Sequence, residues 1–220
     1  MENLSKKLPA EFVSRLKEQL GGNVNDYLKA IDEPSVRGVR VNTTKISVDE
    51  CVKIFENELN TKLLKIDYAR DGFILNSVEK FGNEASHLAG LYYFQEPSSM
   101  VAVVASNIEK ENRPLKVLDL CASPGGKTGQ IACRVSDDSL IVSNEIISSR
   151  ASVLFSNVER QGFKNVIVTN EEPERLLGFE GFFDYVFVDA PCSGEGMFRK
   201  NPETIKEWNQ GNVELYSYFY

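Results

Sequence analysis

Two segments of this 220-residue sequence share one pattern, an apolar run of strand length that ends on an acidic residue and continues into a loop rich in Gly and Pro. The first run ends at Asp119 and leads into residues 120–128, and the second ends at Asp189 and leads into residues 190–196. In open parallel sheets, ligands bind at the carboxyl ends of the strands. The two loops therefore predict a ligand site at one edge of such a sheet.

Strand and helix patterns alternate along the second half of the chain. The predicted strands span residues 115–120, 139–144, 165–169 and 183–188, and the predicted helices span 126–134, 148–161 and 202–217. Such alternation is typical of βαβ units, so we expect an α/β fold with a parallel sheet and helices on both of its faces. Before it, residues 91–96 predict a short extended run, and a helix over 97–105 begins at Pro97.

The first 90 residues predict a small α+β domain. A helix that begins at Pro9 ends at Gly21, residues 36–42 alternate as a strand does, and Ser47 with Glu50 forms a capping box for a second helix. We therefore divide the chain into an N-terminal domain, residues 1–90, and a second domain, residues 91–220.

Composition excludes several classes of protein. The net charge of −7 argues against nonspecific attraction of nucleic acid, so any RNA contact must use local basic patches. The 4 Cys residues form no Cys-x-x-Cys pair and there is 1 His, so we expect no metal site. No apolar stretch is long enough to span a membrane and the N-terminus lacks the apolar core of a signal peptide, so we expect a cytoplasmic protein.

The first loop does not match the common nucleotide-binding motifs. A P-loop requires Gly where this chain has Cys121, and the dinucleotide motif Gly-x-Gly-x-x-Gly is missing. The Asp119 carboxylate would repel a pyrophosphate but suits a cation, and S-adenosylmethionine carries an ammonium and a sulfonium. Glu145 and Asn170 end the next two predicted strands, where they could bind a ribose and an adenine. The three strand ends thus predict a site for S-adenosylmethionine.

The sequence resembles the Sun/Nop-type RNA cytosine-5 methyltransferases, especially the bacterial branch that acts on small-subunit ribosomal RNA. The resemblance rests on Leu118-Asp-Leu-Cys-Ala-Ser-Pro-Gly-Gly-Lys-Thr128 and Asp189-Ala-Pro-Cys-Ser-Gly194, supported by residues 39–43 and 93–100. It implies a class I (Rossmann-like) methyltransferase sheet and transfer of a methyl group from S-adenosylmethionine to C5 of a cytosine in RNA. Ribosomal RNA is the expected substrate, with transfer RNA next.

The resemblance also implies roles for single residues. Glu145 is expected to bind the ribose, and Asp189 to lie between the methyl group and the target base. Asn170 stands where the family usually has Asp, which leaves its part in adenine binding open. For Arg150, a surface or ion-pair role is favoured over ligand contact. The loop expected to hold the methionine end of the cofactor comprises Cys121, Ala122, Ser123, Pro124, Gly125, Gly126 and Lys127.

The chemistry of the family requires a thiol, because C5 of cytosine is a weak nucleophile until a thiolate adds at C6. The family's nucleophile sits in a Thr-Cys motif after the fifth strand, and the cysteine that matches Cys192 assists breakdown of the covalent adduct. The 220 residues contain no Thr-Cys pair. We therefore expect a methyltransferase sheet that is incomplete at the C-terminus, in a truncated chain that is poorly stable and nearly inactive alone. We favour the helper role for Cys192, with nucleophile as the alternative.

Other interpretations remain open. A methyltransferase acting on an exocyclic amino group usually carries Asp/Asn-Pro-Pro-aromatic at the fourth strand end, which residues 189–192 lack. A remnant that binds RNA or cofactor without turnover is the non-enzymatic alternative. Truncation would leave Trp208, Leu215, Tyr216, Phe219 and Tyr220 on an exposed apolar surface. The candidate RNA-binding residues are Arg37, Arg40, Arg199 and Lys200, of which the first two could equally form a solvated strand face.

Overall fold

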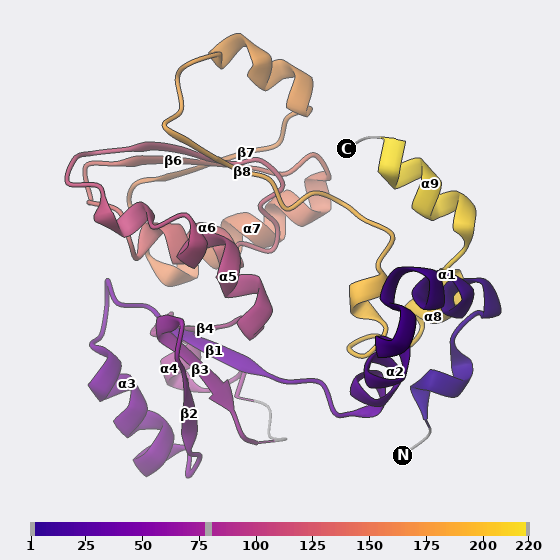
Figure 1. The fold of residues 1–220 in the computed structure, drawn as a ribbon. Helices are drawn as coiled ribbons and strands as arrows, with labels where there is room; N and C mark the ends of the chain where they lie inside the picture. The colour runs from indigo at the N-terminus through magenta and orange to yellow at the C-terminus, as the bar shows by residue number, and fades with distance from the viewer. Residues whose placement is uncertain (1–2, 78–80, 219–220) are drawn as a thin grey trace. The chain divides into compact units, whose positions relative to one another are not determined.

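The computed structural model describes residues 3–77 and 81–218, and the packing divides the chain into two units (Figure 1). Met1–Ser35 packs with Ala190–Tyr220 in what we call the helical unit. Val36–Asp189 forms the other, which we call the two-sheet unit because it contains both β-sheets. The predicted division at residue 90 falls inside the two-sheet unit.

The helical unit is built from short helices around an aromatic core. Phe12 lies 5.1 Å from Phe198 and 5.6 Å from Trp208, measured between ring centroids, and all three side chains are buried. The first predicted helix is confirmed, including its end at Gly21. The helices of this unit are α1 (Ala10–Leu20), α2 (Val24–Asp32), α8 (Thr204–Glu207) and α9 (Gln210–Tyr218), with 3-10 turns at Leu4–Lys7, Gly21–Asn23 and Glu195–Met197.

The predicted single helix over 202–217 is wrong, because the chain breaks between α8 and α9. Trp208 has extended backbone angles, φ −66° and ψ 132°, and its ring packs into the aromatic core. The prediction that Trp208 is stranded on the surface is also wrong, since it is 8% exposed, whereas Leu215 is exposed as expected. The side chains of Tyr216, Phe219 and Tyr220 lie outside the described part of the chain.

The first sheet of the two-sheet unit is antiparallel. Its strands are β1 (Gly38–Val41), β2 (Leu63–Ile66), β3 (Ala69–Leu75) and β4 (Tyr92–Phe94), in the order β2-β3-β1-β4. The predicted capping box at Ser47 is confirmed and begins α3 (Val48–Lys53), which continues as a π-helix over Ile54–Glu58. A short helix, α4 (Ala85–Leu88), precedes β4. Strand β4, which the sequence assigned to the second domain, pairs with β1 in this sheet.

The second sheet is parallel, as predicted. Its strands are β5 (Lys116–Asp119), β6 (Leu140–Asn144), β7 (Val166–Thr169) and β8 (Tyr185–Phe187), in the order β7-β6-β5-β8. The helices of this part are α5 (Pro97–Ala105), α6 (Gly126–Ala132) and α7 (Ser148–Gln161), with 3-10 helices at Ile108–Lys110 and Pro173–Phe179. The predicted bounds of α5 and α7 agree with the structure.

Helices cover the two faces of the parallel sheet unequally. Figure 1 shows α5, α6 and α7 on the side that faces the antiparallel sheet, while the connection from β7 to β8 crosses the other side. Right-handed crossovers explain why α6 and α7 lie on one face, because β5, β6 and β7 follow one another in the same direction across the sheet. The chain then returns to β8 on the other side of β5, so this connection crosses the opposite face. Among the described residues that second connection holds only the 3-10 helix Pro173–Phe179, so the expected α-helices on both faces are not found there.

The strand order reverses at β5, which creates the place where ligands bind in such sheets. In the register of the sheet, Asp119 pairs with Ser143 on one side and Phe187 on the other. Glu145 follows the end of β6, and Asp189 follows the end of β8. The fold therefore brings these predicted site residues to the same edge.

Candidate cofactor and catalytic site

Asp119 is a buried carboxylate at the end of β5. The Thr128 hydroxyl donates to its Oδ2 at 2.7 Å and lies 3.0 Å from Ser143 Oγ, so one α6 side chain joins two strand ends. Burial, only partly offset by the Thr128 bond and the Lys127 charge, raises the pKa of Asp119 to about 6. Among the described residues, Asp119 Oδ1 has no hydrogen-bond partner. A buried acceptor without a donor suits a cationic ligand that can donate to it.

The loop after β5 is held in place by its own backbone and by α7. Ala122 N donates to Asn144 O at 2.8 Å, and Asn157 Nδ2 donates to Pro124 O at 2.9 Å. Gly125 has φ +103°, a conformation that favours glycine, and a Cβ there would lie 3.1 Å from Leu154 Cδ1. The loop is therefore shaped before any ligand arrives.

Lys127 and Asp189 join the two predicted loops. Their side chains form an ion pair between the first turn of α6 and the end of the β8 segment, with Asp189 largely exposed and Lys127 largely covered. Cys121 lies nearby, and burial followed by the charges of Glu145, Asp119 and Asp189 raises its pKa. A thiol with a raised pKa is a poor nucleophile, so the Cys121 side chain is not suited to attack a base.

Glu145 is buried but already engaged. Ile147 N donates to its Oε1 at 3.1 Å, and Arg150 Nη2 lies 3.3 Å from its Oε2. Arg150 Nη2 also donates to Ser123 O at 3.1 Å, while Ser123 Oγ donates to Arg150 O at 2.9 Å. Arg150 thus makes an ion pair, as the sequence favoured, and it ties the first loop to α7.

Asn170 uses its amide nitrogen within the site. Its Nδ2 donates to Glu145 O at 2.6 Å and to Ile146 O at 2.9 Å, which fixes the backbone after β6. The side-chain oxygen of an amide is an acceptor for the amino group of adenine. Its predicted contact with adenine stays a prediction.

Cys192, Arg199 and Lys200 belong to the helical unit, and all three residues are exposed there. Arg199 donates from Nη1 to Ala30 O at 3.3 Å. The roles predicted for these residues, in catalysis and in RNA binding, stay predictions.

The position of Arg40 corrects its assignment as an RNA contact. Arg40 is fully buried on β1, where Nε donates to Gln95 Oε1 at 2.9 Å and Nη1 donates to Gly129 O at 3.2 Å. Its guanidinium lies against α6 because Val39 and Val41 point to the opposite face, into the core around Phe55. A side chain without exposed surface cannot reach a phosphate in this structure. Arg37 is half-buried, donates to Ser77 O at 3.1 Å and lies over Phe94.

Sequence reasoning missed the residues that support the site from behind. Gln161 and Asn157 are four positions apart on α7, so they share a face. Gln161 accepts from Arg40 and Asn157 donates to the first loop. Their spacing on a predicted helix was the available indication, but nothing in the sequence says which side chains they meet.

Two features are absent from the part of the chain that the structure describes. Within residues 3–77 and 81–218, no group of three or more His, Cys, Asp or Glu side chains could hold a metal ion. No helix in the same part of the chain is long and apolar enough to cross a membrane.

Comparisons with protein families match almost the whole chain. The family described as the N-terminal domain of 16S rRNA methyltransferase RsmF matches residues 8–97, and the family described as 16S rRNA methyltransferase RsmB/F matches residues 103–217. The Ribosomal RNA small subunit methyltransferase F of Pectobacterium atrosepticum is 37% identical over 214 residues, covering 94% of this chain and 44% of the relative. That of Vibrio parahaemolyticus is 38% identical over 212 residues, with the same coverage. The chain spans less than half the length of these relatives.

Solved structures share the fold. A methyltransferase homolog from Pyrococcus horikoshii has a TM-score of 0.76 at 29% identity and covers 94% of this chain and 68% of its own. NSun6 from the same organism, solved with SFG, has a TM-score of 0.81 at 18% identity and covers 94% of this chain and 76% of its own. The second likeness concerns the fold alone.

Proposed function

The chain belongs to the RsmB/F family of 16S rRNA methyltransferases, and from this premise we propose that it transfers a methyl group from S-adenosylmethionine to C5 of a cytosine in RNA. Ribosomal RNA is the favoured substrate, transfer RNA the next, and the cytoplasm the favoured location. The observation that carries the proposal is the meeting of Asp119, Glu145 and the Lys127–Asp189 pair at one edge of the parallel sheet.

The proposed cofactor contacts follow the strand ends. Asp119 offers a buried acceptor without a donor to the ammonium, the loop over residues 121–127 surrounds the methionine end, and Glu145 accepts from the ribose hydroxyls. Asn170 is proposed to contact adenine. When bound, S-adenosylmethionine supplies an electrophilic methyl group, and the chain itself has to orient the base and activate C5.

Asp189 is proposed to hold the target base. A carboxylate accepts from the exocyclic amine of cytosine, and the pairing with Lys127 keeps the Asp189 side chain at the sheet edge. A cysteine thiolate then adds to C6, which makes C5 nucleophilic enough to accept the methyl group. Removal of the C5 proton lets the thiolate leave. We propose that Cys192 assists this last stage, because the family assigns the helper role to the position that matches it.

The role of Cys192 can be separated from that of a nucleophile. RNA that contains 5-fluorocytosine traps the adduct, since no C5 proton can be removed. If Cys192 is a helper, the SDS-stable adduct that the wild type forms in the presence of S-adenosylmethionine is retained in Cys192→Ser. An adduct that forms with the wild type and is lost in Cys192→Ser would make Cys192 the nucleophile instead.

The proposed reaction is tested by incubating the chain with unmodified 16S rRNA and S-adenosylmethionine labelled in the methyl group. After digestion, label in 5-methylcytidine that is lost in Asp119→Ala supports the proposal. Label in N4-methylcytidine would contradict it and favour transfer to an exocyclic amine.

A second candidate function is binding of RNA and cofactor without turnover. The raised pKa values of the Cys51 and Cys121 thiols favour it, because neither thiol is suited to attack a base. It predicts saturable binding of S-adenosylmethionine with no label transferred to RNA. In either case we propose that residues 1–90 serve RNA recognition and that residues 91–220 form the S-adenosylmethionine-dependent methyltransferase domain.

A further inference from the structure

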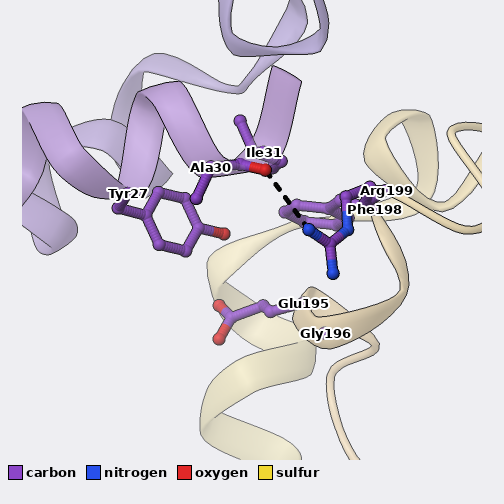
Figure 2. A pocket seen from close by; sticks show the side chains of 7 residues that line it. All are labelled: Tyr27, Ala30, Ile31, Glu195, Gly196, Phe198 and Arg199. Atoms are coloured by element: carbon purple, nitrogen blue, oxygen red, sulfur yellow. Dashed lines mark hydrogen bonds between the residues drawn. The ribbon is translucent and has the colours of Figure 1, made fainter. Parts of the chain in front are cut away.

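The helical unit contains a pocket of about 250 Å³ between α2 and the segment that follows Cys192. Figure 2 shows the Tyr27 ring on one side, Phe198 and Arg199 on the other, and the Glu195 carboxylate facing the same hollow. Pockets that enclose drug-sized ligands measure about 300–1,000 Å³. The volume therefore suits one flat base rather than a whole nucleotide.

Glu195 is held ready as an acceptor. Trp208 Nε1 donates to Glu195 Oε1 at 2.8 Å, and Arg15 Nη2 lies 3.2 Å from the same oxygen. The two oxygens of a carboxylate can accept about four hydrogen bonds. Arg15 Nη2 also donates to Glu195 Oε2 at 3.5 Å, so these donors fix the orientation of Glu195 and leave Oε2 with capacity to accept one further hydrogen bond.

Arg199 and Tyr27 supply donors beside this acceptor. Arg199 uses Nη1 for Ala30 O, and a guanidinium has five N–H donors in total. Burial, followed by the charge of Glu195, raises the pKa of Tyr27, which keeps its hydroxyl neutral. The half-buried Tyr27 ring contributes the exposed aromatic surface of the lining, and the Phe198 side chain, which also lines the pocket, is fully buried. The pocket thus offers an aromatic surface, a fixed carboxylate and a guanidinium.

We propose that this pocket binds an unpaired guanine base of the RNA substrate. Guanine presents O6 with N7, two adjacent acceptors for the Arg199 guanidinium, and its N1–H or 2-amino group can donate to the remaining acceptor position on Glu195 Oε2. Adenine lacks the carbonyl that stands beside N7 in guanine, and uracil and cytosine lack N7, so only guanine offers the guanidinium this pair of acceptors. Unpaired RNA bases are commonly read by stacking on aromatic rings with hydrogen bonds to their edges. The inference rests on the proposed function for the choice of RNA as ligand.

The guanine would lie near the target cytosine along the RNA. Glu195 is three residues from Cys192, and an extended chain of that length spans at most about 10 Å. A nucleotide next to the target, or one beyond it, is therefore within reach of the pocket. The pocket would then select the sequence context of the methylated site.

The experiment measures fluorescence anisotropy of labelled nine-residue RNAs that contain no cytosine, so the catalytic site is not addressed. The first RNA is oligouridine with a central guanine, the second is oligouridine with a central adenine, and the third contains uridine at every position. We expect the guanine RNA to bind about ten-fold more tightly than the other two. Arg199→Gln and Glu195→Gln should each reduce this preference to less than about two-fold.

Lys200→Gln is the matched control, because it removes one positive charge from the residue next to Arg199 without changing the pocket lining. It should weaken binding of all three RNAs by the same factor. Equal affinity of the wild type for the three RNAs overturns the inference, and so does a preference that survives both pocket variants. Thermal unfolding of each variant verifies that it is folded. If Glu195→Gln does not fold, Arg199→Gln alone tests the pocket, because Arg199 is exposed and its replacement leaves the core unchanged.

S-adenosylmethionine binding by the same preparations separates this inference from the proposed function. A chain that binds the cofactor but shows no guanine preference contradicts the pocket assignment alone. A chain with the guanine preference that fails to bind the cofactor contradicts the proposed function and supports the pocket.

Discussion

Arg150 Nη2 lies 3.3 Å from Glu145 Oε2 and donates to the Ser123 carbonyl at 3.1 Å. One guanidinium therefore links the acid proposed for the ribose to the loop proposed for the methionine end. The Glu145 side chain is 3% exposed and the Arg150 side chain is 47% exposed, so the ion pair joins a buried carboxylate to a guanidinium at the surface. Arg150 is a positioning residue in this account, and Glu145 is the contact.

This arrangement predicts unequal effects on cofactor affinity. Glu145→Gln should weaken S-adenosylmethionine binding more than about ten-fold, because it removes the charged acceptor for two hydroxyls. Arg150→Gln should weaken it only about three-fold, since the bond from Ser123 Oγ to Arg150 O uses backbone and survives the change. Isothermal titration measures both. An Arg150 variant that loses as much affinity as the Glu145 variant would make Arg150 the contact.

Replacement of Arg40 should lower the stability of the fold, because this side chain is a buried hydrogen-bond donor and not an RNA contact. Arg40→Met would leave Gln95 and the Gly129 carbonyl without their buried donor, at a cost of about 2–4 kcal/mol in the free energy of unfolding. The exposed Arg70→Met is the control and should change it by less than about 0.5 kcal/mol. Urea unfolding gives both values. Equal stability of the two variants would remove the structural role assigned to Arg40.

Gly129 sits against the same network. A Cβ at this position would lie 2.7 Å from Arg40 Nη2 and 2.7 Å from Gln161 Oε1, both buried. Gly129→Ala should therefore lower the melting temperature, although alanine normally stabilises a helix interior by about 1 kcal/mol. Gly22→Ala, where nothing lies within 4 Å, is the comparison and should not lower it. A stabilised Gly129 variant would show that the network has room to move.

The Arg40 network also marks a limit of sequence reasoning. The alternation over residues 36–42 correctly predicts strand β1, and Val39 and Val41 share a face as expected. The alternation cannot tell whether the Arg40 face meets water or a helix. Here α6 covers it, and helix carbonyls and glutamine amides replace the water.

Local patterns predicted the parallel sheet best. The four parallel strands follow from apolar runs, and the start of α5 follows from Pro97. The break before α9 escaped prediction because Trp208 is drawn into a core formed with Phe12, 196 residues earlier in the chain. Asp119 and Glu145 were placed correctly at one edge, but their partners Thr128, Ser143 and Arg150 depend on tertiary packing.

The raised pKa of buried Asp119 should make the chain less stable as pH rises through the range in which this carboxyl loses its proton. Its folded pKa of about 6 lies above the ordinary value of 3.8, so between these values the folded chain binds more protons. Its contribution to the free energy of unfolding therefore falls as pH rises from about 4 to 6, by about 3 kcal/mol. Asp119→Asn should remove this fall, measured by urea unfolding across that range.

Asp184 provides a contrast of opposite sign. Its hydrogen bond from Arg113 lowers its pKa, so its contribution to stability is lost as pH falls. Asp184→Asn should therefore remove a loss of stability at low pH. If Asp119→Asn and Asp184→Asn changed the pH profile in the same sense, the buried state of Asp119 would be contradicted.

The most direct test of the account is calorimetric titration of the chain with S-adenosylmethionine, repeated on Asp119→Ala and Glu145→Ala. We expect saturable binding at one site by the wild type and its loss in both variants, each with a folded far-ultraviolet spectrum. A folded wild-type chain that binds no S-adenosylmethionine, or binding that persists in both variants, would contradict the cofactor site at the ends of β5 and β6.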